Sequence, residues 1–478
     1  MKLFLIFASK YSESREMLSV FKKNGHEILY WVYTDMDGNA REEMKGTICH
    51  NHYAAWAGNP AEGVDINEFA PPGKDLIEKM YKVESLVLTM MNKKFDTRCV
   101  DDRRHVYYGM LQYWKGILDK YKPDAIIIPV VPHTVYNFIL YELAKLAGIR
   151  TIMFEDTWVI DRLLAYEDWM EGSKKLHEAM AKNTGKNFSP SDLSNDLKEY
   201  YFKQTNPQVD STPVYMDYWK NKYSLLNKFF ARLKLTKESL LDGTIYRKVP
   251  QFIVKQFQIN LKKEYEALQS NPDLSKKFVY VPLGFQPERT TSPQGDMFVD
   301  QILTVKILSF SLPKDWLIYV KEHPAQWWLR MGINYSSARY KGYYNRLASI
   351  PNVKLVPVND NSYELIGKSQ AVAVVTGTAG WEAVLRSKPT LIFGYPWYRD
   401  CPEVFRINDT KTCNAALNKI AGGYKVSQQN LVNFLKSFDE ATDVAYIEGF
   451  IDKISKLTRE ESALKVASLM LFWLENKK

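Results

Sequence analysis

Two strand-to-helix junctions in the second half of the chain carry residues that could bind an anion. The first, Trp316–Pro324, ends in His323, and the second spans Ala371–Ala383. Both are short apolar, β-branched runs that stop at polar or small residues, and parallel α/β sheets bind ligands at such carboxyl ends of strands. The second junction contains in order Thr376, Gly377, Thr378, Ala379 and Gly380. Small side chains at a helix start let a phosphate approach the backbone N–H groups, so the pattern indicates a nucleotide or nucleotide sugar.

His323 and Glu382 are the side chains that the two junctions offer for binding. Pro324 favours an extended backbone at His323, whose imidazole could donate to a phosphate oxygen or carry positive charge beside it. Glu382 lies one turn into the second helix and could accept hydrogen bonds from ribose hydroxyls. The alternative is a hydrogen-bonded loop histidine and a tightly packed helix whose dipole Glu382 complements. Lys321, at the end of the first strand, joins the binding candidates.

Polar residues also follow the strand predicted at Phe278–Leu283. Gln286, Glu288 and Arg289 lie in the next loop and could contact base, sugar or acceptor, because loops on a rigid scaffold often carry function. The alternative is a solvated loop that precedes a helix near Met297.

Two adjacent carboxylates, Glu155 and Asp156, end a predicted strand in the first half of the chain. Either could act as general base or nucleophile in sugar transfer. Capping of a helix or turn explains the pair equally well. The candidate catalytic residues are therefore Asp156, Glu155 and His323, and no metal ligands are predicted.

Length and composition indicate two α/β domains. A chain of 478 residues exceeds one ordinary core, and 46% hydrophobic with 25% charged residues is typical of globular proteins. Four scattered cysteines predict no disulfide framework, and the absence of a long apolar run or signal pattern predicts a cytoplasmic protein. The net charge of +9 allows nucleic acid, anionic lipid or anionic glycan as partners and does not choose among them.

The order of predicted elements divides the chain into four parts. Strands at Lys2–Ala8, Glu27–Tyr33, 124–131 and Arg150–Phe154 alternate with helices, and Asp35–Pro72 is expected to be loop. A second alternating set has strands at Phe278–Leu283, Leu317–Lys321, Lys354–Val358, Ala371–Val375 and Thr390–Phe393. The predicted parts are a Rossmann-like domain at 1–164, a helical insertion and connection at 165–276, a second Rossmann-like domain at 277–443 and C-terminal helices at 444–478. This is a GT-B-like α/β fold, in which two parallel-sheet domains face a cleft.

The insertion contains a basic, aromatic stretch, Tyr215–Leu235. Such a helix can lie on an anionic membrane surface or bind an anionic glycan. The interpretation that we favour is an ordinary helix with a solvated basic face and an apolar face in the core.

Several of these motifs together resemble the bacterial capsule polysaccharide biosynthesis family. That family includes CMP-Kdo-dependent Kdo transferases and is similar in outline to GT-B sialyltransferases. The motifs are Glu155-Asp156, Gln286-Pro287, Lys321-Glu-His-Pro324, Thr378-Ala-Gly-Trp-Glu-Ala383, Arg386-Ser-Lys-Pro389 and Gly394-Tyr-Pro-Trp-Tyr398. The resemblance is most specific over Phe278–Arg406 and departs from the Kdo-transferase pattern at Thr157 and at Arg399-Asp-Cys-Pro402.

The resemblance implies a metal-independent glycosyltransferase of surface polysaccharide synthesis without a cofactor. His323 and the Thr376–Gly380 turn would hold the nucleotide phosphate of a donor such as CMP-Kdo, and Asp156 or Glu155 would lie at the reacting carbon. The other partner is a glycan or glycolipid acceptor, with no nucleic acid and with peripheral contact at the inner membrane surface as an option. The alternatives are a nucleotide-sugar epimerase of related fold and a non-catalytic polysaccharide-binding or assembly factor.

Overall fold

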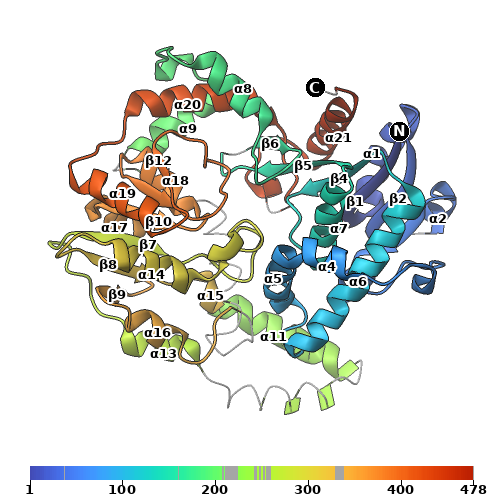
Figure 1. Cartoon of the computed structure of the whole chain (residues 1–478), viewed down its shortest axis with the longest axis horizontal. Helices are drawn as coiled ribbons and strands as arrows, with labels where there is room; N and C mark the ends of the chain where they lie inside the picture. Colours follow the sequence, from blue (N-terminus) through green and yellow to red (C-terminus); the bar gives the residue numbers. More distant parts are fainter. Residues whose placement is uncertain are drawn as a thin grey trace. The chain divides into compact units, whose positions relative to one another are not determined.

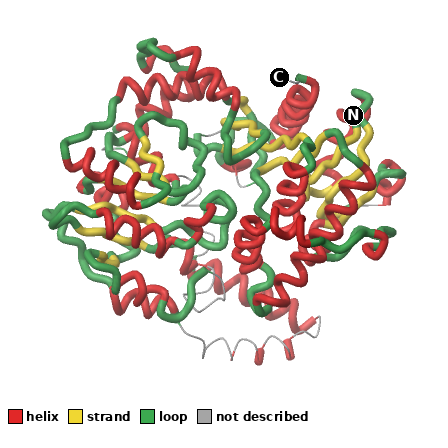
Figure 2. Tube along the Cα trace, in the orientation of Figure 1, coloured by secondary structure: helices red, strands yellow, loops and turns green. Residues whose placement is uncertain are grey.

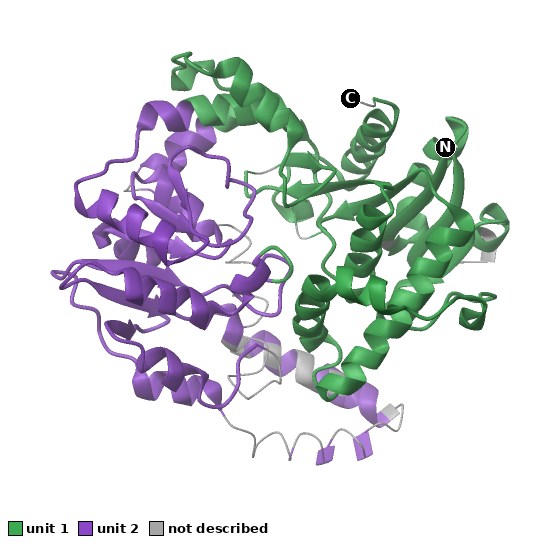
Figure 3. Ribbon diagram, viewed as in Figure 1, with its two compact units in different colours: residues 1–197, 292–294, 433–478 green, residues 198–291, 295–432 purple. Residues whose placement is uncertain are grey.

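The computed structural model describes residues 1–36, 38–159, 161–206, 209, 224–241, 245–246, 249–250, 253, 260–328, 338–449 and 451–476 (Figure 1). Strands and helices alternate along both halves of the chain, as Figure 2 shows by colour. The chain forms two units, coloured separately in Figure 3. Unit 1 comprises Met1–Leu197, Ser292–Gln294 and Asn433–Lys478, and unit 2 comprises Lys198–Thr291 and Gly295–Val432. The four-part division predicted above stays a prediction.

Unit 1 is built on a mainly parallel sheet. Among the described residues it has seven strands in the order β13-β6-β5-β4-β1-β2-β3. Their bounds are β1 (Lys2–Lys10), β2 (Glu27–Asp35), β3 (Ile48–Asn51), β4 (Ala125–Val130), β5 (Arg150–Asp156), β6 (Arg162–Tyr166) and β13 (Asp443–Val444). Strands β3, β2, β1, β4 and β5 are parallel, which confirms the predicted α/β pattern of this part.

The helices of unit 1 cover both faces of this sheet. Along β1, Leu3 and Leu5 pack with Leu18 of α1 and Val466 of α21, whereas Phe4 faces the other way and contacts Tyr30. Tyr30 in turn contacts Trp114 of α6, so this helix covers the second face. Alternate residues of a strand point to opposite faces, which explains the near-continuous apolar sequence of β1.

Helices lie between and after the strands of unit 1, as the alternating pattern predicted. They are α1 (Tyr11–Lys23), α2 (Gly38–Glu43), α3 (His52–Ala57), α4 (Lys74–Lys79), α5 (Tyr81–Met90), α6 (Val100–Tyr121), α7 (Val135–Leu146), α8 (Lys174–Asn183) and α21 (Arg459–Glu475). Short 3-10 helices in the chain cover Ile66–Glu68, Met91–Lys93, Pro190–Asp192, Asp296–Val299 and Ile451–Lys453.

Three strands of unit 1, β3, β6 and β13, were not predicted. The expectation of loop throughout Asp35–Pro72 is wrong, because this stretch contains β3 with α2 and α3 on either side. The polar residues of β3 hide its strand character, and they are satisfied by tertiary contacts such as His50 Nδ1 with the hydroxyl of Tyr30 at 2.6 Å. At the other edge, β6 pairs antiparallel with β5, and β13 pairs antiparallel with β6. Because β13 includes Val444, the predicted C-terminal part is not helical throughout.

Unit 2 contains a second sheet, which is parallel throughout. Among the described residues its order is β12-β11-β10-β7-β8-β9. The strands are β7 (Phe278–Pro282), β8 (Leu317–Lys321), β9 (Val353–Leu355), β10 (Ala371–Val374), β11 (Thr390–Ile392) and β12 (Val404–Arg406). Five of these strands were predicted, and the fold class of two Rossmann-like α/β units is confirmed.

The core of unit 2 lies between this sheet and its helices. Val279 of β7, Ile318 of β8 and Ala373 of β10 share one buried cluster with residues of the flanking helices. The helices of this part are α13 (Leu261–Leu268), α14 (Gln301–Ser311), α15 (Ala325–Trp328), α16 (Tyr343–Ala348), α17 (Ser362–Lys368), α18 (Thr378–Leu385) and α19 (Thr410–Ala421). The chain is completed by α9 (Asn195–Thr205), α11 (Leu225–Leu241) and α20 (Gln428–Ala441).

The predicted basic, aromatic stretch Tyr215–Leu235 is described from residue 224 onward, and its earlier residues lie outside the described part. In α11, Leu226, Phe229 and Phe230 are exposed, so our preferred interpretation of a core-facing apolar side is wrong for these three. No helix among the described residues has the length and apolar character needed to cross a membrane.

Candidate functional site

The candidate binding residues of unit 2 follow three neighbouring strands of one parallel sheet. β7 lies between β10 and β8 and runs parallel to both. The loop at Gly284, the His323-Pro324 dipeptide and the turn at Thr376 therefore all leave the same edge of the sheet. This arrangement confirms the expectation that the three motifs share an edge, where parallel sheets bind their ligands.

Hydrogen bonds join these three connections directly. The Thr376 hydroxyl donates to the carbonyl of Thr290. Gln326, just after His323, donates through Nε2 to the Gln286 carbonyl at 3.1 Å, and its Oε1 accepts from the Gln286 N–H at 3.2 Å. The loop after β7 is thus fixed on one side to the turn after β10 and on the other to the segment after β8.

A backbone hydrogen bond assigns one tautomer to the His323 ring. Its ring is half-buried, and Nδ1 accepts a hydrogen bond from the backbone N–H of Ala325 at 3.2 Å. Burial lowers the pKa of His323 to about 4, with Glu322 opposing this shift and Arg339 and Lys321 adding to it. At neutral pH the ring is uncharged, and because Nδ1 is an acceptor the ring proton sits on Nε2. His323 therefore presents a neutral N–H donor rather than a positive charge.

The start of α18 offers backbone donors. Gly377 is the N-cap residue and has no side chain with which to cap the first N–H groups of the helix. Thr378 and Ala379 are half-buried, so their backbone can meet a ligand. The hydroxyl of Thr376 already bonds to Thr290, so it holds the loop in place.

Gly380 is where α18 comes closest to the sheet. A Cβ atom there would lie 2.5 Å from the Tyr398 hydroxyl and 2.7 Å from Cγ2 of Val374. That hydroxyl donates to the carbonyl of Gly377 at 2.6 Å. Within the Thr376–Gly380 turn, position 380 thus requires glycine because α18 packs closely against Tyr398 and Val374 there. The same packing fixes the start of the helix.

Glu382 lies in the second turn of α18 and is half-buried. Burial raises its pKa to about 7, and the opposing effect of the Arg386 charge is smaller. A carboxyl with this pKa changes charge near neutral pH and can then either donate or accept.

Lys321 and Gln286 have structural partners. The Lys321 ammonium donates to the Asp360 carbonyl at 2.7 Å and to the Ser362 hydroxyl at 2.6 Å, and burial lowers its pKa to about 8. Gln286 is buried and donates through Nε2 to the carbonyl of Val299 at 2.8 Å. Both residues shape the loops at this edge, and their predicted contact with a nucleotide stays a prediction.

Glu288 and Arg289 follow Gln286 in the same loop. Glu288 is exposed and accepts from the Thr290 hydroxyl at 3.2 Å, while Arg289 is half-buried. Their predicted contact with base, sugar or acceptor also stays a prediction.

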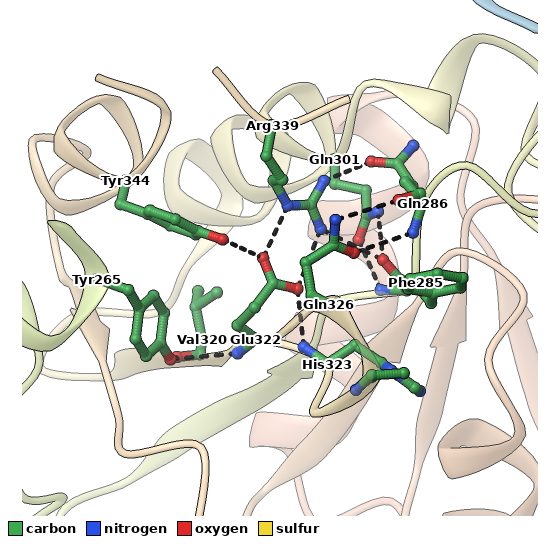
Figure 4. A network of polar contacts seen from close by, with 12 residues as sticks. Tyr265, Phe285, Gln286, Gln301, Val320, Glu322, His323, Gln326, Arg339 and Tyr344 are labelled. Carbon is green, nitrogen blue, oxygen red and sulfur yellow. Dashed lines mark hydrogen bonds and ion pairs between the residues drawn. The ribbon is translucent and has the colours of Figure 1, made fainter. Parts of the chain in front are cut away.

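A buried ion pair beside His323 was not predicted. The Glu322 carboxylate and the Arg339 guanidinium are joined by bonds of 2.7 Å and 3.1 Å, as Figure 4 shows. Their side chains are 0% and 1% exposed. Glu322 was visible in the Lys-Glu-His-Pro motif, but no sequence signal connects it with Arg339.

The acidic pair of unit 1 is buried and fully hydrogen-bonded. Glu155 accepts from the Tyr166 hydroxyl at 2.9 Å and from Gln294 Nε2 at 2.8 Å. Asp156 accepts from the backbone N–H groups of Ile447 and Glu448 at 3.1 and 3.0 Å. Asp156 thus stabilises the turn that follows β13, a role like the capping alternative above, and a catalytic role of either residue stays a prediction.

No group of three or more His, Cys, Asp and Glu side chains that could hold a metal ion occurs among the residues the structure describes.

Comparison with known proteins identifies one family and several structures. Residues 249–401 match the family described as "Capsule polysaccharide biosynthesis protein", and no curated protein sequence matches the chain. The chain is similar to the beta Kdo 2,7 transferase of Thermosulfurimonas dismutans KpsC, with 12% identity, a TM-score of 0.33 and coverage of 75% of this chain and 90% of that chain. The beta Kdo 2,4 transferase of the same protein has 14% identity and a TM-score of 0.33, with coverage of 67% of this chain and 79% of that chain. The UDP-GlcNAc 2-epimerase from Methanocaldococcus jannaschii has 11% identity and a TM-score of 0.25, with coverage of 92% of this chain and 98% of that chain.

The family match contains the His323 and Thr376–Gly380 motifs and covers roughly a third of the chain. Over residues 249–401, the resemblance of this protein to the capsule polysaccharide biosynthesis family is confirmed.

Proposed function

We propose that this protein is a glycosyltransferase of bacterial surface-polysaccharide synthesis that uses a nucleotide-activated sugar. The observation that carries the proposal is the position of the family match. It covers the carboxyl ends of β7, β8 and β10 in unit 2, which are followed by the Gln286 loop, by His323 and by the start of α18. An N–H donor and a helix start with a glycine N-cap, both at one sheet edge, suit a nucleotide phosphate.

In this proposal the donor is a CMP-linked acidic sugar such as Kdo, and the acceptor is a glycan or glycolipid. Nε2–H of His323 and the backbone N–H groups of Thr378 and Ala379 bind the phosphate oxygens. Glu382, as a carboxylate, accepts from the ribose hydroxyls. Protein donors of this kind stabilise a leaving phosphate without a metal ion.

The transfer step breaks the bond between the sugar carbon and the phosphate oxygen, which keeps the electron pair. The acceptor hydroxyl forms the new bond to the sugar carbon, and its proton passes to a carboxylate. Asp156 or Glu155 is the proposed carboxylate, and it has to exchange a present hydrogen-bond partner for substrate. In this proposal the protein acts in the cytoplasm.

The first test is the thermal stabilisation of the protein by CMP, CDP, UDP and GDP. A ligand that binds the native state alone raises its unfolding temperature, so the panel identifies the nucleotide. His323→Ala should weaken binding about ten-fold through loss of one hydrogen bond to a charged group. His323→Asn keeps an N–H donor and should weaken binding less.

His105→Ala is the matched control, because His105 is an exposed histidine of α6 in unit 1. It should bind the nucleotide like the wild type. Unchanged affinity in a folded His323→Ala variant would remove His323 from the site. Release of free sugar from the donor without any acceptor would favour an epimerase-like reaction instead of transfer.

A further inference from the structure

The Glu322–Arg339 pair is the most buried ion pair among the described residues of unit 2, with side chains 0% and 1% exposed. Bringing two charges out of water is costly, and apolar residues of the same size often stabilise a fold equally well. Stability alone therefore does not account for this pair, and its position within the site has to be considered.

Glu322 holds the backbone of its neighbour His323. Oε1 of Glu322 accepts from the His323 N–H at 2.7 Å as well as from Arg339 at 3.1 Å. Oε2 accepts from Arg339 Nε and from the Tyr344 hydroxyl, both at 2.7 Å. Each carboxylate oxygen thus has two donors, so the carboxylate cannot turn without breaking bonds, and His323 is fixed with it.

Arg339 extends from Glu322 to the loop after β7. One terminal nitrogen donates to the side-chain oxygen of Gln286, and the other lies 3.3 Å from the carbonyl of Gly284. Figure 4 shows the guanidinium between the Glu322 carboxylate and this loop. A planar guanidinium with five N–H donors suits such a junction, and lysine cannot reproduce it.

We propose that Glu322 and Arg339 are positioning residues, which orient Nε2–H of His323 and fix its distance from the loop that contains Gln286. The inference rests on the proposed function, because it concerns the same nucleotide site. The pair acts through the His323 backbone and the Ala325 N–H that defines the ring tautomer, and neither residue has to touch the ligand.

The test compares single and double replacements. Arg339→Met and Glu322→Leu each leave one buried charge unpaired, so each should unfold at a lower temperature. The double variant Glu322→Leu/Arg339→Met removes both charges and should recover most of that stability. If the pair positions His323, the double variant still binds CMP about ten-fold more weakly, as expected for a misplaced hydrogen bond to phosphate. Arg339→Lys keeps the positive charge but lacks the planar guanidinium with its several N–H donors. Its CMP affinity should lie between those of the wild type and the double variant.

The matched control is Arg150→Met/Glu167→Leu, a pair of unit 1 with a 2.6 Å contact. It changes a largely buried ion pair far along the chain from His323 and should leave CMP affinity unchanged. A double variant as stable as the wild type and with wild-type CMP affinity overturns the proposal.

A second readout needs no ligand. The ¹⁵N shifts of the His323 ring, assigned with His323→Ala, should show a single tautomer with the proton on Nε2 in the wild type. The double variant, and Arg339→Lys if the double variant does not fold, should show a mixture of tautomers. An unchanged single tautomer overturns the proposal. If the wild type binds none of the four nucleotides, the proposed function fails, while the ring shifts still decide whether the pair positions His323.

Discussion

Replacement of Gly380 by alanine tests how tightly the start of α18 is fixed. The added Cβ would lie 2.5 Å from the Tyr398 hydroxyl, 2.7 Å from Cγ2 of Val374 and 3.1 Å from Cγ2 of Thr390. Contacts below 3.0 Å cannot persist, so either α18 or a neighbour has to move. Tyr398 is 1% exposed, so its ring is enclosed by the protein and cannot swing out into solvent.

The expected loss of stability has two parts. Overpacking of a buried position costs typically about 1–3 kcal/mol. A displaced Tyr398 hydroxyl would lose its bond to the Gly377 carbonyl, and an unsatisfied buried group costs about 1–3 kcal/mol. Alanine in place of glycine within a helix returns about 1 kcal/mol. The net expectation is destabilisation by about 1–5 kcal/mol, with nucleotide affinity reduced because the backbone donors of α18 shift.

Urea unfolding of the variant and the thermal shift produced by CMP measure the two effects. Gly367→Ala is the matched control, because Gly367 lies in α17 of the same unit and a Cβ there meets nothing within 4 Å. The control should be as stable as the wild type or up to about 1 kcal/mol more stable. A Gly380→Ala variant as stable as this control would refute the reasoning that α18 is held by close packing at Gly380.

Three further predictions concern charged groups. The pKa of Glu382 is raised to about 7, so if its carboxylate accepts from ribose hydroxyls, cytidine binding should strengthen as pH rises through 7, whereas Glu382→Gln should show no such pH dependence in titration calorimetry. Asp156→Asn should lose about 1–3 kcal/mol of stability, because the new amide would face two backbone N–H groups. If this variant and Glu155→Gln both keep a single-turnover rate within about two-fold of wild type, the acidic pair has a structural role only. Burial lowers the pKa of His50 from 6.5 to about 4, so the unfolded state takes up the proton first as the pH falls. The contribution of His50 to stability should therefore fall by about 3 kcal/mol between pH 6.5 and 4, and His50→Gln should remove this part of the acid dependence in urea unfolding.

The sheet architecture could be predicted because its strands are buried on both faces. Strands such as β1, β4, β8 and β10 are continuous apolar runs that end at polar or glycine residues. In a parallel sheet this pattern also fixes which loops share an edge, so the grouping of His323 with the Thr376–Gly380 turn followed from sequence.

The sequence by itself determined the α/β class, the two sheets and the motifs at their carboxyl edges. The tertiary structure decided the partners of those motifs: Glu322 with Arg339, Lys321 with Asp360 and Ser362, and Asp156 with the backbone at Ile447. It also decided that β3 is a strand. Periodicity and turn residues report local conformation, whereas a buried polar group takes whichever partner the chain brings to it. For Asp156 these partners are 291 and 292 residues away.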